Sequence, residues 1–260
     1  MNNHSPLVSL VGAGPGDPEL LTRRGASRLG AADLVLYDAL VDPALLELAP
    51  RARRWFVGKR AGKRAMQQET IGKLMVRAAR RGQRVVRLKC GDPCVLGRGG
   101  EEALVLAEAG VPYEIVPGVS SALAAPALAG IPVTHRGLSS GFVVITGHSA
   151  ASTDPLLDGL APGRYTVVVL MGLRRRRAIA QRLIERGWPA DTEMAVLTSA
   201  SHADATRWLG TLGAVALGLC DADESRPGTL VIGDVVGLAR SIGGAEVPLQ
   251  ATKQAQGGSR

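Results

Sequence analysis

A glycine-rich segment with an acidic residue inside it, residues 87–102 (RLKCGDPCVLGRGGEE), is well suited to binding a small molecule. Glycine adopts backbone angles that other residues avoid and lets a ligand approach closely, so Gly91 and the glycines after it predict a shaped loop. Asp92 precedes Pro93, which restricts both residues and would hold the carboxylate in place. That carboxylate could accept hydrogen bonds from a ribose or an ammonium group. A polar turn without a ligand is the alternative interpretation.

A second glycine run, residues 12–18 (GAGPGDP), lies between a predicted strand over 7–11 and a predicted helix over 19–29. Folds of the α/β class bind ligands at the carboxyl ends of their strands, so this loop is expected to contact a ligand. The third glycine of a G-x-G-x-x-G dinucleotide motif would fall at Asp17, and Pro15 would disturb the turn. A standard dinucleotide site is therefore not expected.

Charged residues follow two further predicted strands. Asp38 comes directly after the strand 33–37, where its carboxylate would face a bound ligand, although a turn or capping role is an equal alternative. Lys59 and Arg60 follow the strand 53–57. They would suit the rim of an anion site, or they are simply solvated.

Alternating strands and helices continue along the chain and predict an α/β protein. Helices are expected over 67–81, 103–109, 174–186 and 235–240, and strands over 84–88, 113–116, 142–146, 166–171, 194–198 and 229–232. A stretch rich in Ser, Asp, Pro and Gly predicts a linker. The expected organisation is an α/β domain over 1–147, a linker over 148–163, an α/β domain over 164–243 and a polar tail over 244–260.

Composition limits the class of protein. The chain has 260 residues, of which 46% are hydrophobic but only 3% aromatic, so aliphatic residues must build its core. The net charge of +8 favours an anionic partner, and the lack of aromatic stacking platforms argues against nucleic acid. The three cysteines lack zinc or redox spacing and are expected to be free thiols. With no long apolar run or signal peptide, we expect a soluble cytoplasmic protein.

Three other features have sufficient structural explanations. Ser120 could cap the alanine-rich helix that follows it. His135 stands alone, without an acid or a nucleophile at a telling spacing. The arginines at 174–177 would mostly form a solvated face of a helix, with a polyanionic substrate as the alternative.

Ordered motifs over residues 8–240 resemble the uroporphyrinogen-III C-methyltransferases of the tetrapyrrole methylase family. They read VSLVGAGPGDPELLT, DLVLYDALV, VGKRAG, RLKCGDPCVLGRGGEE, VPGVSSA, GIPVTHRG, VITGH, VVLMG and PGTLVIGDVV.

The resemblance implies a tetrapyrrole methylase fold, with two α/β domains, a mixed sheet in each, and S-adenosylmethionine bound in a cleft between them. It implies methylation of uroporphyrinogen III at C2 and C7 to give precorrin-2, with S-adenosylhomocysteine as the other product. It also implies a homodimer and no metal. Some family members are fused to a dehydrogenase/ferrochelatase module, which is not expected here because the sequence begins at the methylase motifs.

Carried over residue by residue, the resemblance assigns a base role to Asp38 and an accompanying role to Lys59. It lines the donor site with Pro15, Cys90, Gly91, Asp92, Val95, Ser120, Ser121, Met171 and Ala200. Cys90 replaces a usual glycine and Cys94 a usual aromatic residue. Because the substrate is a polycarboxylate, Arg87, Arg98 and Arg136 are candidate clamps, together with the 174–177 run.

Two alternatives within the same superfamily remain, and a third is excluded. Later precorrin methyltransferases of the corrin pathway and ribosomal-RNA methyltransferases belong to the same superfamily, although the THRG and GRGGEE motifs favour the early tetrapyrrole enzyme. A protein that only sequesters a tetrapyrrole would have to lack Asp38 or the donor loop, and both are present.

Overall fold

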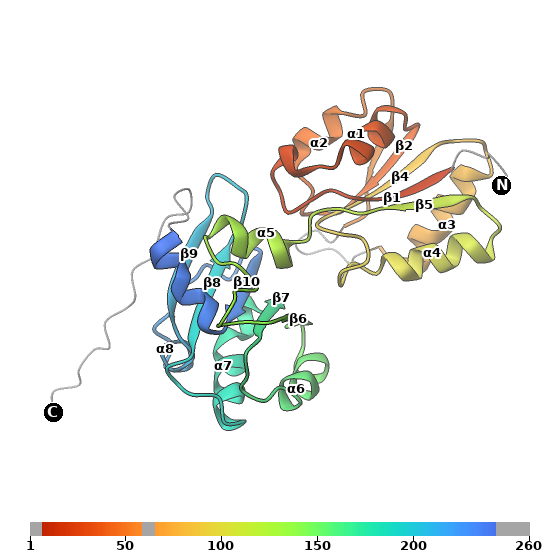
Figure 1. Ribbon diagram of the computed structural model, residues 1–260. Helices are drawn as coiled ribbons and strands as arrows, with labels where there is room; N and C mark the ends of the chain where they lie inside the picture. Colours follow the sequence, from red (N-terminus) through yellow and green to blue (C-terminus); the bar gives the residue numbers. More distant parts are fainter. Residues whose placement is uncertain (1–6, 59–65, 243–260) are drawn as a thin grey trace. The chain divides into compact units, whose positions relative to one another are not determined.

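The computed structural model describes residues 7–58 and 66–242, which form two compact units divided between Ser120 and Ser121. Each unit is built on one five-stranded sheet with helices packed against it (Figure 1). The expectation of two α/β domains is therefore confirmed.

The sheet of the first unit has the strand order β3-β2-β4-β1-β5, and its pairings are all parallel. A parallel sheet corrects the expectation of a mixed sheet in each domain. The elements are β1 (Val8–Gly12), the 3-10 helix η1 (Pro18–Leu20), α1 (Arg23–Gly30), β2 (Leu34–Tyr37), α2 (Pro43–Glu47), β3 (Arg53–Phe56), α3 (Gln68–Ala79), β4 (Val85–Lys89), α4 (Gly99–Glu108) and β5 (Tyr113–Val116).

Helices cover both faces of this sheet, with α1 and α2 on one side and α3 and α4 on the other (Figure 1). Leu29 and Leu45 belong to the core of the first face, whereas Met75 and Leu106 belong to the core of the second. Because both faces are covered, β1 and β4 are buried along their whole length.

Capping side chains decide where the helices of this unit begin. The hydroxyl of Thr22 accepts a hydrogen bond from the backbone N–H of Gly25, and the carboxylate of Asp42 accepts one from Ala44. The cap at Thr22 explains why the single helix expected over 19–29 is instead η1 followed by α1.

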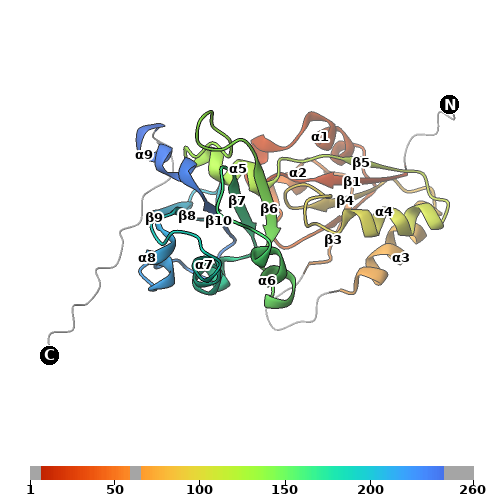
Figure 2. The same ribbon diagram turned by 60° about the horizontal axis from the view of Figure 1, so that its bottom comes forward.

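The sheet of the second unit has the order β6-β7-β10-β8-β9, and it is mixed because only the pairing of β6 with β7 is parallel. Figure 2 shows this unit from a second side. The elements are α5 (Ser121–Leu128), β6 (Phe142–Thr146), α6 (Ala150–Asp158), β7 (Thr166–Leu170), η2 (Leu173–Arg175), α7 (Arg176–Glu185), β8 (Glu193–Thr198), β9 (Thr206–Thr211), α8 (Leu212–Ala216), β10 (Gly228–Ile232), η3 (Asp234–Leu238) and α9 (Ala239–Ile242).

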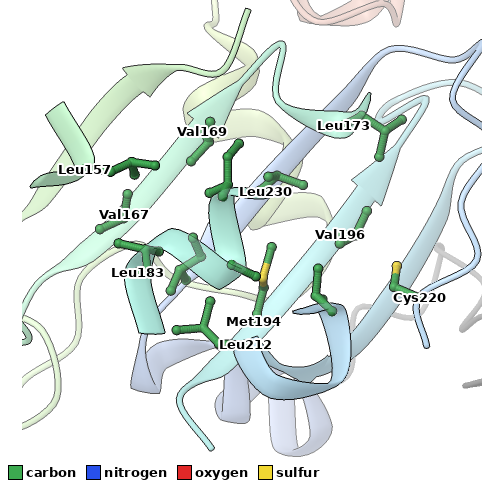
Figure 3. Packing of buried hydrophobic residues seen from close by; sticks show 14 of the residues in the cluster. Leu157, Val167, Val169, Leu173, Leu183, Met194, Val196, Leu212, Cys220 and Leu230 are labelled. Atoms are coloured by element: carbon green, nitrogen blue, oxygen red, sulfur yellow. The ribbon is translucent and has the colours of Figure 1, made fainter. Parts of the chain in front are cut away.

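An aliphatic core fills the space between this sheet and the helices α6, α7 and α8. Figure 3 shows Leu157, Leu183 and Leu212 of these helices facing strand residues such as Val167 and Met194. The other face of the sheet is covered by α5, η3 and α9. Strand β9 and helix α8 were not expected from the sequence, although Trp208 of β9 is completely buried.

The division between the units differs from the expected one. Residues 121–147 cluster with the second unit because β6 pairs with β7 and α5 packs on β7 and β10. The segment expected to be a linker, 148–163, contains helix α6. Its composition reflects a cap, since the Ser149 hydroxyl accepts a hydrogen bond from the backbone N–H of Ser152.

Candidate active site

Three loops of the first unit meet where the neighbouring strands β4, β1 and β5 end. A Cβ atom on Gly118 would lie 2.3 Å from the carbonyl oxygen of Gly91 and 2.7 Å from the Cα of Gly12, so these backbones can approach only as glycines. The N–H of Gly91 donates to the carbonyl of Gly14 at 2.7 Å, and the N–H of Gly14 donates back at 3.2 Å. The structure therefore joins the two predicted glycine loops, with Pro15 buried in the first.

Asp92 fastens the loop after β4 to the loop after β5. Its Oδ1 accepts a hydrogen bond from the backbone N–H of Cys94 at 2.8 Å, and its Oδ2 accepts one from Gly118 at 3.0 Å. A carboxylate oxygen can accept a second hydrogen bond, so contact between Asp92 and the methyl donor stays a prediction beside this structural role.

Several non-glycine residues of the described chain have a positive φ angle, a conformation that costs ~1–3 kcal/mol and tends to occur at functional sites. Met171 (φ 59°) is itself a predicted donor-site residue, and Leu96 (φ 54°) adjoins the predicted Val95. Both neighbours of the predicted Ala200 share the feature. The full set of described non-glycine residues with a positive φ angle is Leu96, Arg98, Met171, Ser199 and Ser201.

Asp38 follows β2 with its side chain 30% exposed, and Arg87 of β4 holds it. The Nη2 of Arg87 donates to Oδ1 of Asp38 at 2.6 Å, while Nη1 donates to the backbone carbonyls of Leu36 at 3.4 Å and Leu88 at 3.2 Å. The Arg87 side chain is only 3% exposed. This geometry corrects the expectation for Arg87, because its donors are occupied by the protein and do not offer a free clamp for a substrate.

Glu102 of α4 lies behind Arg87 and is fully buried. Its Oε1 accepts hydrogen bonds from Gln68 Nε2 at 2.7 Å, Arg87 Nε at 3.0 Å and Lys89 Nζ at 3.1 Å. Its Oε2 is buried and has no hydrogen-bond partner among the residues that the structure describes. Burial, followed by the positive charge of Arg87, lowers the pKa of Lys89, while Glu102 and Asp38 oppose that shift. Arg87, Glu102 and Lys89 are buried and Asp38 is partly exposed, and together they form one cluster with two charges of each sign.

Sequence reasoning missed Glu102 and Lys89, although a signal was present. Arg87 and Lys89 stand two apart in a strand that is otherwise apolar, so their side chains point to the same face of the sheet. Two cations on a buried face require carboxylate partners. Glu102 is one of two acids in the first turn of the next helix, beside Glu101.

Cys90 is a neutral thiol in the loop after β4. Burial, with a contribution from the Asp38 carboxylate, raises its pKa to about 11, against a smaller opposing effect of the Gly91 backbone N–H. Its Sγ donates to the carbonyl of Gly14 at 3.8 Å. Cys94 is exposed, and neither of them nor Cys220 forms a disulfide. The unusual residue at position 90 therefore adds an uncharged side chain to the loop.

The remaining predicted residues occupy varied positions. Met171 follows β7 and is 50% exposed. Ser121 begins α5, and Ser120 is buried. Lys59 lies outside the described residues. The residues predicted to line the donor site come from both units. A donor site formed by both units therefore stays a prediction.

The predicted arginine clamps differ in their accessibility. Arg98 is 58% exposed and makes two hydrogen bonds to Glu101, at 2.9 and 2.7 Å. Arg136 is exposed in the second unit. Two arginines of the 174–177 run form ion pairs within the chain. Arg175 pairs with Asp154 at 2.8 Å, and Arg176 pairs with Glu224 at 2.6 Å. The structural interpretation of that run is favoured.

Metal binding and membrane insertion both bear on function. In the ranges 7–58 and 66–242, no group of three or more His, Cys, Asp or Glu side chains is placed to hold a metal ion. None of the helices described there is long and apolar enough to cross a membrane.

Comparison with known proteins identifies the family. The model of the family "Tetrapyrrole (Corrin/Porphyrin) Methylases" matches residues 7–216. Siroheme synthase 1 of Yersinia enterocolitica is 47% identical over 93% of this chain but only 51% of its own length. Siroheme synthase of Neisseria meningitidis is 45% identical over 93% of this chain and 50% of its own length. The chain thus spans about half the length of these curated relatives.

Solved structures agree with the family match. The uroporphyrin-III C-methyl transferase of Thermus thermophilus, complexed with S-adenyl homocysteine, is 42% identical with a TM-score of 0.76, over 89% of this chain and 99% of that one. A cobalt precorrin-4 methyltransferase is 27% identical with a TM-score of 0.73, over 88% and 95%. The chain therefore belongs to the tetrapyrrole (corrin/porphyrin) methylases.

Proposed function

We propose that the chain catalyses S-adenosylmethionine-dependent C-methylation of uroporphyrinogen III, at C2 and C7, to give precorrin-2. In each transfer a carbon–carbon bond forms at the pyrrole carbon while the bond from methyl to sulfur breaks. The electron pair stays on sulfur, and S-adenosylhomocysteine leaves. The alkylated macrocycle must then lose a proton.

The observation that carries this proposal is the placement of Asp38. Its carboxylate is partly exposed at the carboxyl end of β2 and fixed from behind by Arg87 at 2.6 Å. A fixed carboxylate can accept the proton that the macrocycle releases, a contribution typically of about 10²–10⁴ in rate. The likeness to the Thermus thermophilus uroporphyrin-III C-methyl transferase, over 99% of that protein, supports the same acceptor.

The protein's remaining task is to position the two reactants, because the sulfonium already activates the methyl group. We assign the donor to the glycine loops and to Met171 and Ala200. The strained angles at Leu96, Met171, Ser199 and Ser201 support this assignment. Lys59, by its resemblance to the family's lysine, would accompany Asp38.

The test is an anaerobic incubation of the purified chain with uroporphyrinogen III and methyl-labelled S-adenosylmethionine, analysed by mass spectrometry. We expect two labelled methyl groups per macrocycle in the wild type. Asp38→Ala should lose this product and still bind S-adenosylhomocysteine in a calorimeter. Asp42→Ala, which removes only a helix cap, is the matched control and should retain both methyl transfer and S-adenosylhomocysteine binding.

A different result would identify a different acceptor. Donor binding without methyl transfer would overturn the proposed substrate, and precorrin intermediates would be tried next because of the likeness to cobalt precorrin-4 methyltransferase. An Asp38→Ala variant with normal turnover would remove the base role and leave the reaction intact.

Two further assignments belong to the same proposal. The first is that the chain forms a homodimer, which light scattering of the purified chain would detect. A monomer with normal turnover would show that the dimer is not required for activity. We also place the enzyme in the cytoplasm, where fractionation of cells should find it.

A further inference from the structure

We infer that Glu102 is a positioning residue for Asp38, acting through Arg87, and that Lys89 and Gln68 hold Glu102 in place. This inference rests on the proposed function for its kinetic consequences. Its geometry is independent of the substrate.

The first step is the way in which Arg87 is divided between two acids. Its Nε donates to Glu102 at 3.0 Å, and its Nη2 donates to Asp38 at 2.6 Å. A guanidinium is planar and presents its donors in a fixed fork, so a restraint on one edge orients the other. Glu102 therefore determines the direction from which Arg87 meets Asp38.

The second step is that Glu102 is itself held. Gln68 of α3 and Lys89 of β4 donate to the same Oε1, at 2.7 and 3.1 Å. The side chain of Glu102 is fully buried, and that of Lys89 is 4% exposed. A catalytic group is held most firmly when the residues behind it are locked by packing and hydrogen bonds.

The third step is the cost that this arrangement carries. Within the described part of the chain, Oε2 of Glu102 is buried without a hydrogen-bond partner, which is unfavourable for a carboxylate oxygen. The three buried charges of Arg87, Lys89 and Glu102 are also a weak source of stability, since apolar replacements are often as stable. A structural purpose alone accounts poorly for the cluster, whereas the need for a correctly placed Asp38 accounts for it.

The kinetic test uses Glu102→Gln, which keeps the shape and removes the charge. We expect kcat to fall about ten-fold or more, because Asp38 is no longer held in the productive position. The KM for S-adenosylmethionine and the affinity for S-adenosylhomocysteine should change less than about two-fold, because donor binding does not use this cluster. Glu108→Gln, an exposed position of the same helix, is the matched control and should turn over as the wild type.

A second variant separates positioning from folding. The double variant Lys89→Met with Glu102→Gln leaves one cation and one acid, so its buried charges balance again and it should unfold at nearly the wild-type temperature. Its kcat should remain about ten-fold low. Recovery of turnover together with stability would show that the cluster only supports the fold and would overturn the inference, as would normal turnover in Glu102→Gln.

A spectroscopic measurement keeps the inference testable if the proposed acceptor is wrong. The Nε–H of Arg87 should give a slowly exchanging signal in the ¹⁵N NMR spectrum of the full chain, assigned by its loss in Arg87→Lys. Glu102→Gln should shift this signal and speed its exchange, and Glu108→Gln should not. An unchanged signal would mean that Glu102 does not orient Arg87, whatever substrate the enzyme uses.

Discussion

Two arginines, Arg87 of the first unit and Arg177 of the second, are placed in opposite ways. In the first unit, Arg87 is 3% exposed and contacts two carboxylates of a buried cluster. In the second unit, Arg177 is exposed on the surface of α7 and donates to the backbone carbonyl of Ala216, at 2.9 Å. Burying charge is costly, so it is expected where a function requires a fixed charge. The comparison indicates that the dense arginine run is structural and that the isolated Arg87 serves the site.

The largest expected effect is on the free energy of unfolding when Arg87 and Arg177 are each replaced by methionine, which keeps an apolar stem of similar length. Arg87→Met leaves Asp38 and Glu102 without their shared partner and should cost about 3–5 kcal/mol of unfolding free energy. Arg177→Met should cost about 1 kcal/mol, the net value of one exposed hydrogen bond. Hydrogen exchange of peptides from each unit would measure the two losses separately. Equal losses would contradict the distinction between the two kinds of arginine.

The glycine contacts give the next largest effect. Gly118→Ala would place a Cβ 2.3 Å from the carbonyl oxygen of Gly91, so the loops must move apart, at a cost of about 1–3 kcal/mol. Binding of S-adenosylhomocysteine should weaken at the same time. Gly100→Ala is the matched control, because nothing lies within 4 Å of the added atom and a helix favours alanine. Calorimetry of both variants would decide, and intact donor binding in Gly118→Ala would remove these loops from the donor site.

These two predictions concern features that differ in how far the sequence revealed them. The glycine loops could be predicted, because a glycine run directly after an apolar strand is a local signal. The contact between Asp38 and Arg87 could not, because it joins residues 49 apart in the chain. It depends on β2 pairing with β4 across a sheet whose order is not the order of the chain.

The second unit was harder to predict for a related reason. Strand β9 has only a short apolar stretch, containing Trp208, and its antiparallel pairing with β8 supplies the rest of its stability. The boundary at Ser120 was missed because composition changes later, where Ser149 caps α6. Composition reports local capping and turns, whereas a boundary depends on which strands pair.

A smaller effect is expected at Arg98, an exposed cation of the first unit. Its partner Glu101 is 55% exposed, so the guanidinium can exchange that carboxylate for one of the substrate's at little cost. Arg98→Ala should raise the KM for uroporphyrinogen III about ten-fold, the value of one charge-assisted contact, and leave donor binding unchanged. Arg80→Ala, at an exposed position near the end of α3, is the control for loss of surface charge. Equal losses of substrate and donor binding would contradict the assignment.

The smallest effect separates the thiols of Cys90 and Cys220, one in each unit, from the exposed thiol of Cys94. Burial raises the pKa of Cys90 to about 11 and that of Cys220 to about 11, so near pH 8 both remain protonated and react slowly. Iodoacetamide should therefore modify the exposed Cys94 first, as mass spectrometry of digested protein would show. Cys90 and Cys220 should become reactive only as the pH approaches their pKa values. Rapid modification of Cys90 at pH 8 would mean that the loop after β4 opens often enough to expose it, which the hydrogen bonds of Asp92 to Cys94 and Gly118 should prevent.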